Sequence, residues 1–227
     1  MINIYGLVLT LLVYFLAVKI KNIGVFSKLP TILTAGVVLI IMLKTSGYDY
    51  SSYNKSAGFI TMLLGPATIA LAFPLVKNID ILKTNKRAVW FGFLFATVVA
   101  ILSTYALGWI FKIDYNVLVS LLPKSVTTPI AIEISKSVGG IPELTACVVI
   151  ITGIVGGLSA HRLLKFLKIK HDVAIGLSVG ASSHVLGTSR CIEKNKEQQA
   201  AVSTLALIIV GLFTALIIPI FLHFVIK

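Results

Sequence analysis

The chain has 227 residues, of which 57% are hydrophobic and only 12% are charged. In soluble domains about a quarter of the residues are charged, so this composition excludes a soluble catalytic module. It predicts an all-α polytopic membrane protein with about seven or eight membrane segments, in a single membrane domain over residues 1–227.

The formal net charge is +12, from 20 basic and 8 acidic side chains. The bases lie between apolar segments rather than on one basic face with aromatic neighbours, so we expect cytoplasmic loops against anionic lipid and no nucleic-acid binding. Cys147 and Cys191 have no CxxC spacing and no nearby His/Cys set, which predicts neither a disulfide nor a metal site. Hydrolase, zinc-protease and phosphate-loop motifs are lacking, so neither enzymatic activity nor a cofactor is predicted.

Two plain membrane spans are predicted at the start of the chain, over residues 4–18 and 31–43. The first bases, Lys19 and Lys21, follow the apolar run instead of preceding it. This order disfavours a signal peptide and places the N-terminus outside the cell.

The third apolar segment, residues 57–76, carries Gly65 and Pro66 at its centre. Proline has no N–H to donate and its ring crowds the preceding turn, so we expect a helix break there. A long unbroken span over 88–111 follows.

The second half begins with LLPKSVTTPIAIEISKSVGG, residues 121–140, in which charges, hydroxyls and two prolines interrupt an apolar sequence. A span over 141–160 is rich in small residues, which allow close helix contact. It continues into the basic segment 161–171, which we interpret as a helical extension at the membrane interface. The alternative for this segment is a helix that binds a partner. A polar-centred segment, 172–190, and a long span, 200–226, complete the chain.

An interrupted segment, a charged link and a long span occur twice, once in each half of the chain. This layout predicts a transporter-like pair of structural repeats, residues 1–111 and 116–227. The basic clusters all become cytoplasmic, as does the C-terminus, if residues 116–138 form a re-entrant hairpin, which makes the second repeat inverted. The alternative is that residues 116–138 cross the membrane as an ordinary span. The repeats are then parallel, and the basic cluster at residues 161–170 lies outside the cell.

The stretch around PKSVTTP has the features of an anion site. Pro123 ends one short helix, and Thr128-Pro129 is predicted to be the N-cap and first residue of the next. Such a helix N-terminus offers unpaired N–H groups and the positive end of the helix dipole to a carboxylate. Alternatively the lysine reaches an interface and the hydroxyls bond local backbone. The predicted substrate-binding residues are Lys124, Ser125, Thr127 and Thr128.

Glu133 follows one turn into this second short helix. Three roles are open from the sequence: an ion pair with Lys124, binding of a coupling cation, or proton transfer.

The segment GASSHVLGTSR, residues 180–190, provides a second polar centre. We expect a helix break at Gly180, with Ser182, Ser183 and His184 in the break. Gly176 and Gly180 form a GxxxG pattern that indicates close helix packing. His184 has a side chain suited to proton coupling, and Arg190 either holds a carboxylate or faces water. The predicted substrate-binding residues here are Ser182, Ser183, His184, Thr188 and Arg190.

Four strings resemble the LrgB/CidB family of bacterial membrane proteins, whose relatives include the plastidial glycolate/glycerate translocator. They are LGPATIALAFPL (64–75), LLPKSVTTPIAIEIS (121–135), GGIPELTACVVIITGIVG (139–156) and GASSHVLGTSR (180–190). The usual SHGIGTAR of the family is SHVLGTSR here, with Val185 in place of glycine and Ser189 in place of alanine. The resemblance also implies a distant similarity to cation/proton antiporter and bile-acid symporter folds, in which two broken helices cross at the site.

The resemblance implies two functions. One is secondary transport of small monocarboxylates such as pyruvate, glycolate or lactate, coupled to protons or a cation, which the two polar centres favour. The other is holin/antiholin-like regulation of murein hydrolase export and autolysis with an LrgA/CidA-type membrane partner. In either case we expect a multi-pass protein of the cell membrane that forms homo-oligomers.

Overall fold

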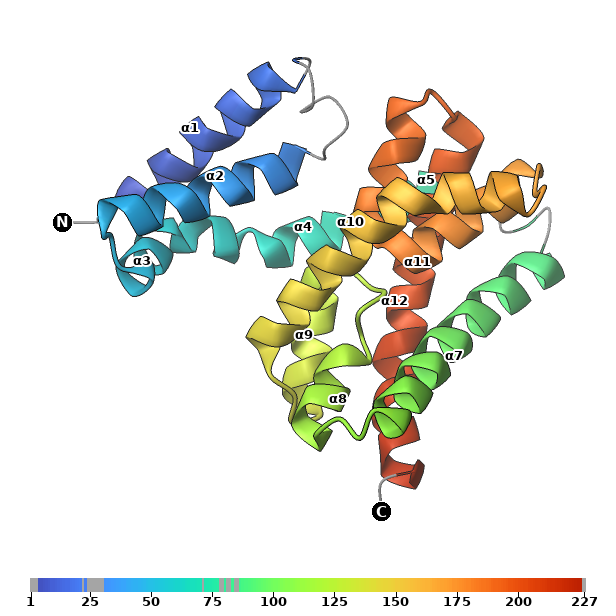
Figure 1. Ribbon diagram of the computed structural model, residues 1–227. Coiled ribbons are helices and arrows are strands. Elements are labelled where there is room, and N and C mark those ends of the chain that lie inside the picture. The colour runs from blue at the N-terminus through green and yellow to red at the C-terminus, as the bar shows by residue number, and fades with distance from the viewer. Residues whose placement is uncertain are drawn as a thin grey trace. The chain divides into compact units, whose positions relative to one another are not determined.

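The computed structural model describes residues 4–21, 23, 31–70, 72–77, 80, 83 and 86–225, and in this part of the chain every regular element is a helix (Figure 1). This confirms the all-α prediction. Among the described residues, three helices are long and apolar enough to cross a membrane. They are α7 (Lys86–Ile110), α10 (Pro142–Phe166) and α12 (Glu197–Val225).

The chain divides into two compact units, Met1–Ile69 and Ala70–Lys227. In the first unit, α1 (Tyr5–Ile20) packs against both α2 (Thr31–Ser46) and α3 (Tyr50–Met62). Both α1 and α2 are apolar helices of 16 residues, close to the positions predicted for the first two spans. The division lies inside α4 (Leu64–Ala70), whereas the predicted repeats meet at residues 111–116, so the repeat stays a prediction.

The first interruption lies slightly before its predicted position at Gly65 and Pro66. Helix α3 ends at Met62 with Leu63 as its C-cap, and α4 begins at the next residue. Pro66 therefore lies in the first turn of α4, where its missing N–H removes no intrahelical hydrogen bond. A further short helix, α5 (Ala72–Lys77), follows.

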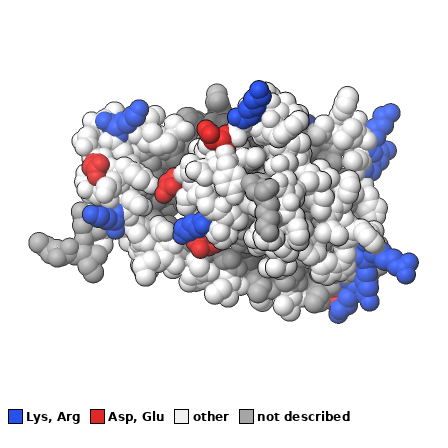
Figure 2. All heavy atoms as spheres, turned by 90° about the horizontal axis from the view of Figure 1, so that it is seen from below, with Lys and Arg blue, Asp and Glu red and all other residues white. Residues whose placement is uncertain are grey.

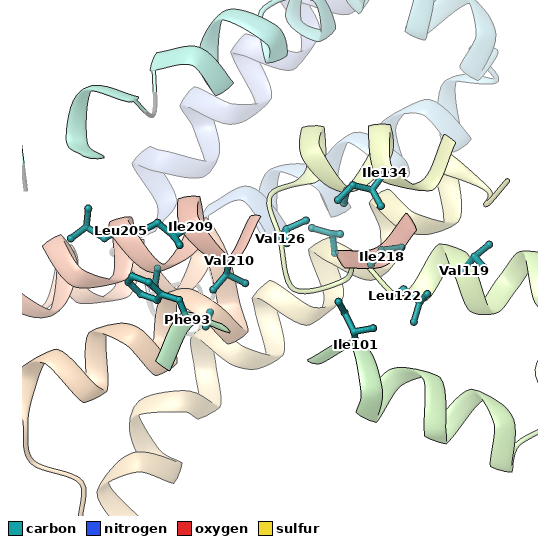
Figure 3. Packing of buried hydrophobic residues seen from close by; sticks show 14 of the residues in the cluster. Phe93, Ile101, Val119, Leu122, Val126, Ile134, Leu205, Ile209, Val210 and Ile218 are labelled. Atoms are coloured by element: carbon teal, nitrogen blue, oxygen red, sulfur yellow. The ribbon is translucent and has the colours of Figure 1, made fainter. Parts of the chain in front are cut away.

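The core of the second unit forms where α12 meets α7 and the two short helices α8 (Tyr115–Leu121) and α9 (Thr128–Ser137). Figure 3 shows Phe93 and Ile101 of α7 near α12 residues such as Val210 and Ile218. Burial of apolar side chains from all four helices holds the segments around residues 121–140 in place.

Close packing of α11 (Asp172–Glu193) on α12 depends on two glycines. A Cβ added at Gly176 would lie 2.6 Å from the carbonyl oxygen of Gln199, and one at Gly180 would lie 2.8 Å from Ser203 Cα. Only glycine lets the two backbones approach this closely. The packing role predicted for the GxxxG pattern is confirmed.

The surface has the apolar character expected of membrane segments. Uncharged residues cover most of the face seen in Figure 2. Large hydrophobic side chains point outward from the long helices, among them Phe95 and Trp109 of α7 and Leu216 of α12. In a helix that crosses a bilayer, such side chains contact lipid.

Candidate functional site

The polar stretch around residue 124 forms the connection between α8 and α9. Helix α8 ends at Leu121, and residues 122–127, which include Pro123, make turns before α9 begins. The N-cap of α9 is Thr127, one residue earlier than the predicted Thr128, and Pro129 lies in the first turn. The shift is possible because a proline is tolerated throughout the first helical turn.

After α9 the chain returns to the last turn of α8. The backbone N–H of Ile141 donates to Ser120 Oγ at 2.7 Å, and the Thr145 hydroxyl lies 2.9 Å from the Ser120 carbonyl oxygen. Gly139 allows the turn after α9 with a φ of +78°, a conformation that favours glycine. Residues 120–141 therefore form a closed hairpin.

The hairpin and α11 contribute to one pocket of about 470 Å³. Lys124 and Ser125 enter it from the hairpin, and Ser182 and Ser178 enter it from α11. The sequence predicted that the two polar centres form one site. The structure brings together Lys124 and Ser125 from the first centre and Ser182 from the second. The remaining wall comes mainly from α7, through Gly92, Phe95, Ala96, Val99 and Ala100, with Thr152, Leu177 and Ala181 completing it.

One positive charge dominates this pocket. Lys124 is half-buried and Ser125 is buried, so the ammonium group lies beside hydroxyls and apolar walls rather than in open water. An anion gains more from a positive charge in such surroundings than at an exposed surface. The lysine and the Ser125 hydroxyl can bind a small carboxylate by charge-assisted hydrogen bonds. The Ser182 hydroxyl donates to the Ser178 carbonyl oxygen at 2.7 Å, so it would have to turn away from that oxygen to donate to a ligand.

The start of α9 has an unsatisfied hydroxyl. The side chain of Thr127 is only 4% exposed, and its Oγ1 has no hydrogen-bond partner among the described residues. A buried hydroxyl without a hydrogen-bond partner costs free energy, which a ligand oxygen bound to it would recover. The N-terminus of α9 would also stabilise a negatively charged ligand oxygen at this position. Thr127 and the half-buried Thr128 do not themselves line the pocket of Lys124.

The interruption of α11 lies at His184, one of the three residues predicted to occupy the break, and not at Gly180. The backbone of His184 has φ 39° and ψ −132°, outside helical geometry, whereas Gly180 packs against α12. The His184 ring is 3% exposed and its Nε2 donates to the Val149 carbonyl oxygen at 2.9 Å. On the other side of the break, the Thr188 hydroxyl bonds the His184 carbonyl oxygen at 2.9 Å and Ser203 Oγ at 2.7 Å.

Three residues predicted to bind substrate therefore make contacts at the helix break and do not line the pocket. Ser183, His184 and Thr188 are all buried between α10, α11 and α12, and Ser183 reaches the pocket only through its 3.0 Å contact with Ser182 Oγ. Small residues of α10 make room for them, since a Cβ at Gly153 would lie 2.7 Å from His184 Nε2. Their contacts hold the helix break that orients Ser182.

Two charged residues lie away from the pocket. Glu133 is exposed and pairs with Lys136 at 2.8 Å, so its predicted alternative pairing with Lys124 is wrong. The i, i+3 neighbour on the same helix is closer than a residue on the far side of the hairpin turn. Arg190 pairs with Glu193 at 3.0 Å near the end of α11.

The contribution of α7 to the pocket was missed from the sequence. An added Cβ at Gly92 would lie 2.6 Å from Leu177 Cδ1, so this glycine brings α7 close to α11 beside the pocket. The segment is apolar on all sides, and such a pattern does not indicate which face meets a neighbour.

Comparison with known proteins identifies the family. The model of the LrgB-like family matches residues 10–224. The chain is 33% identical over 225 residues to "Antiholin-like protein LrgB" of Bacillus subtilis strain 168, covering 97% of the chain and 96% of that protein. Proteins of the same name from Bacillus mycoides KBAB4 and Bacillus cereus B4264 are 32% identical over 222 residues, with the same coverage. No solved structure matches significantly. The chain therefore belongs to the LrgB-like family, and its long apolar helices make it a membrane protein of that family.

Proposed function

We propose that this chain is an antiholin-like regulator of murein hydrolase export and autolysis. The observation that carries the proposal is its similarity, over 97% of its length, to relatives named antiholin-like. Antiholins oppose hole-forming membrane proteins, which fits a chain whose apolar helices expose many large hydrophobic side chains. We further propose that it acts as a homo-oligomer and with a small LrgA/CidA-type membrane partner.

Autolysis in a strain of Bacillus subtilis that lacks its own LrgB protein tests this function. Expression of the chain is expected to slow detergent-induced autolysis relative to the empty vector, and the strain's own protein expressed in the same way is the positive control. Autolysis at the rate of the empty vector, with the chain present in the membrane, would contradict the regulator function.

We propose as a second candidate that the chain carries a small monocarboxylate of the pyruvate, glycolate or lactate type. The supporting observation is the pocket in which Lys124, Ser125 and Ser182 meet from two interrupted helical segments. Interrupted helices tolerate non-helical backbone at membrane depth only beside protein or a cavity, and in transporters they form the substrate site. Coupling to protons or to a cation belongs to this proposal, with His184 and Glu133 as the candidates.

Uptake into proteoliposomes tests the carrier function. Labelled pyruvate, glycolate and lactate are offered to vesicles with and without the purified chain. Saturable uptake of at least one of them that depends on an imposed gradient is expected. Non-saturating leakage of unrelated solutes would instead indicate a hole-forming protein, and the absence of any flux would leave the regulator without carrier activity.

We propose a multi-pass topology in the cell membrane with the N-terminus outside, the C-terminus cytoplasmic and residues 116–138 re-entrant. The closed hairpin at Ser120 and Ile141 supports it. In a variant without the native cysteines, Asp114→Cys and Val138→Cys are both expected to react with an impermeant maleimide added outside whole cells. Labelling of the two positions from opposite sides would show that the segment crosses the membrane.

A further inference from the structure

An aromatic groove lies between α7 and α12, which are in contact (Figure 1). Its volume is about 330 Å³, at the lower end of the range of about 300–1,000 Å³ typical of ligand pockets. The Trp90 and Phe213 rings form one wall, with centroids 6.1 Å apart. Phe91 and Leu94 of α7 line the rest of the apolar part.

The groove opens towards the outside of the helices. The side chains of Phe91, Trp90 and Leu94 are 68%, 44% and 41% exposed. In a membrane-spanning α7, outward-facing apolar side chains such as these contact lipid. An occupant of the groove therefore has an apolar part and comes from the membrane.

Two cationic residues border the same groove, which their apolar stems line while the side chains as a whole are exposed. Lys86 and Arg87 occupy the first turn of α7, a turn with no acidic residue, where the positive end of the helix dipole adds to their charge. Neither forms an ion pair within the described part of the chain. An ammonium and a guanidinium group beside an apolar groove match a phosphate ester attached to an acyl chain.

We propose that this groove binds one anionic phospholipid, with its phosphate on Lys86 and Arg87 and an acyl chain along Trp90, Phe91, Leu94 and Phe213. An apolar partner helix would fill the groove but would offer no anionic group to the two cations. The lipid site is separate from the pocket of Lys124 and does not depend on the proposed function.

Tryptophan fluorescence tests this site, because the chain has only two tryptophans. In the Trp109→Phe variant, Trp90 in the groove is the sole reporter. The full-length variant is reconstituted in phosphatidylcholine vesicles with a low fraction of brominated phosphatidylglycerol or of brominated phosphatidylcholine, since bromine quenches tryptophan on contact. We expect at least twofold stronger quenching by the anionic lipid.

Charge removal separates a specific site from general lipid contact. Lys86→Gln with Arg87→Gln is expected to abolish the preference for brominated phosphatidylglycerol, whereas Lys165→Gln with Lys170→Gln, which removes two exposed charges elsewhere, is expected to preserve it. Equal quenching of Trp90 by both lipids, or a preference that survives loss of Lys86 and Arg87, would overturn the proposal. If neither brominated lipid quenches Trp90, protein covers the groove, and this result would also overturn the proposal.

Discussion

The Lys124→Ala variant is expected to lose saturable monocarboxylate uptake in proteoliposomes. Lys124 supplies the positive charge of the pocket and is half-buried, so water replaces its contact with the substrate poorly. Removing one partner of a buried, hydrogen-bonded charge pair costs about 2–5 kcal/mol. At about 1.4 kcal/mol per factor of ten, we expect KM to rise about 30-fold or more.

The control for this variant lies in the same hairpin. Lys136→Ala removes an equal charge, but Lys136 is exposed and pairs with Glu133, so uptake is expected to stay near that of the parent. Lys124→Arg keeps the charge and is expected to keep part of the uptake. Unchanged KM in Lys124→Ala, with uptake intact, would show that the substrate does not bind in this pocket.

The same variant separates the two candidate functions. If Lys124→Ala loses uptake and still slows autolysis in the Bacillus subtilis strain, antiholin-like regulation does not require transport. If Lys124→Ala loses both uptake and the slowing of autolysis while the protein remains in the membrane, both functions require the pocket. The autolysis assay is therefore run with the Lys124→Ala and Lys136→Ala variants side by side.

Gly180→Ala is expected to destabilise the packing of α11 on α12. The added Cβ would lie 2.8 Å from Ala206 Cβ and from Ser203 Cα, and closer still to the Ser203 carbonyl oxygen. Backbone atoms of α12 cannot move aside as a flexible side chain does, and overpacking of this kind costs about 1–3 kcal/mol. We expect a lower apparent Tm in detergent, by about 2–4 °C for each kcal/mol in a chain of this size.

Gly36→Ala is the matched control. Gly36 is also helical, but no atom lies within 4 Å of a Cβ placed there. Alanine favours a helix over glycine by about 0.5–1 kcal/mol, so this change is expected to leave the apparent Tm unchanged or to raise it. An apparent Tm for Gly180→Ala equal to that of Gly36→Ala would mean that α11 and α12 pack less closely than the structure shows.

Helix positions were largely predictable because the apolar runs are long and their ends are marked by charges or prolines. Predicted spans over 88–111 and 200–226 correspond to α7 and α12. The predictions were less accurate for glycine, because a glycine can either break a helix or allow close helix packing. Gly180 is predicted both as a helix break and as a packing glycine, and the structure gives it only the packing role on α12. The break lies at the buried His184, one of the residues predicted to occupy it.

The sequence by itself determined that the chain is helical and apolar, that residues 122–127 interrupt a helix, and which polar side chains lie at the interruptions. The reason is local: backbone groups in lipid must be satisfied within the helix, and proline cannot supply an N–H. Only the tertiary structure decided that Lys124 shares a pocket with Ser182 and that Glu133 pairs with Lys136 instead. Those outcomes depend on which faces of uniformly apolar helices pack together, and the close approach at Gly92, Gly176 and Gly180 sets that packing.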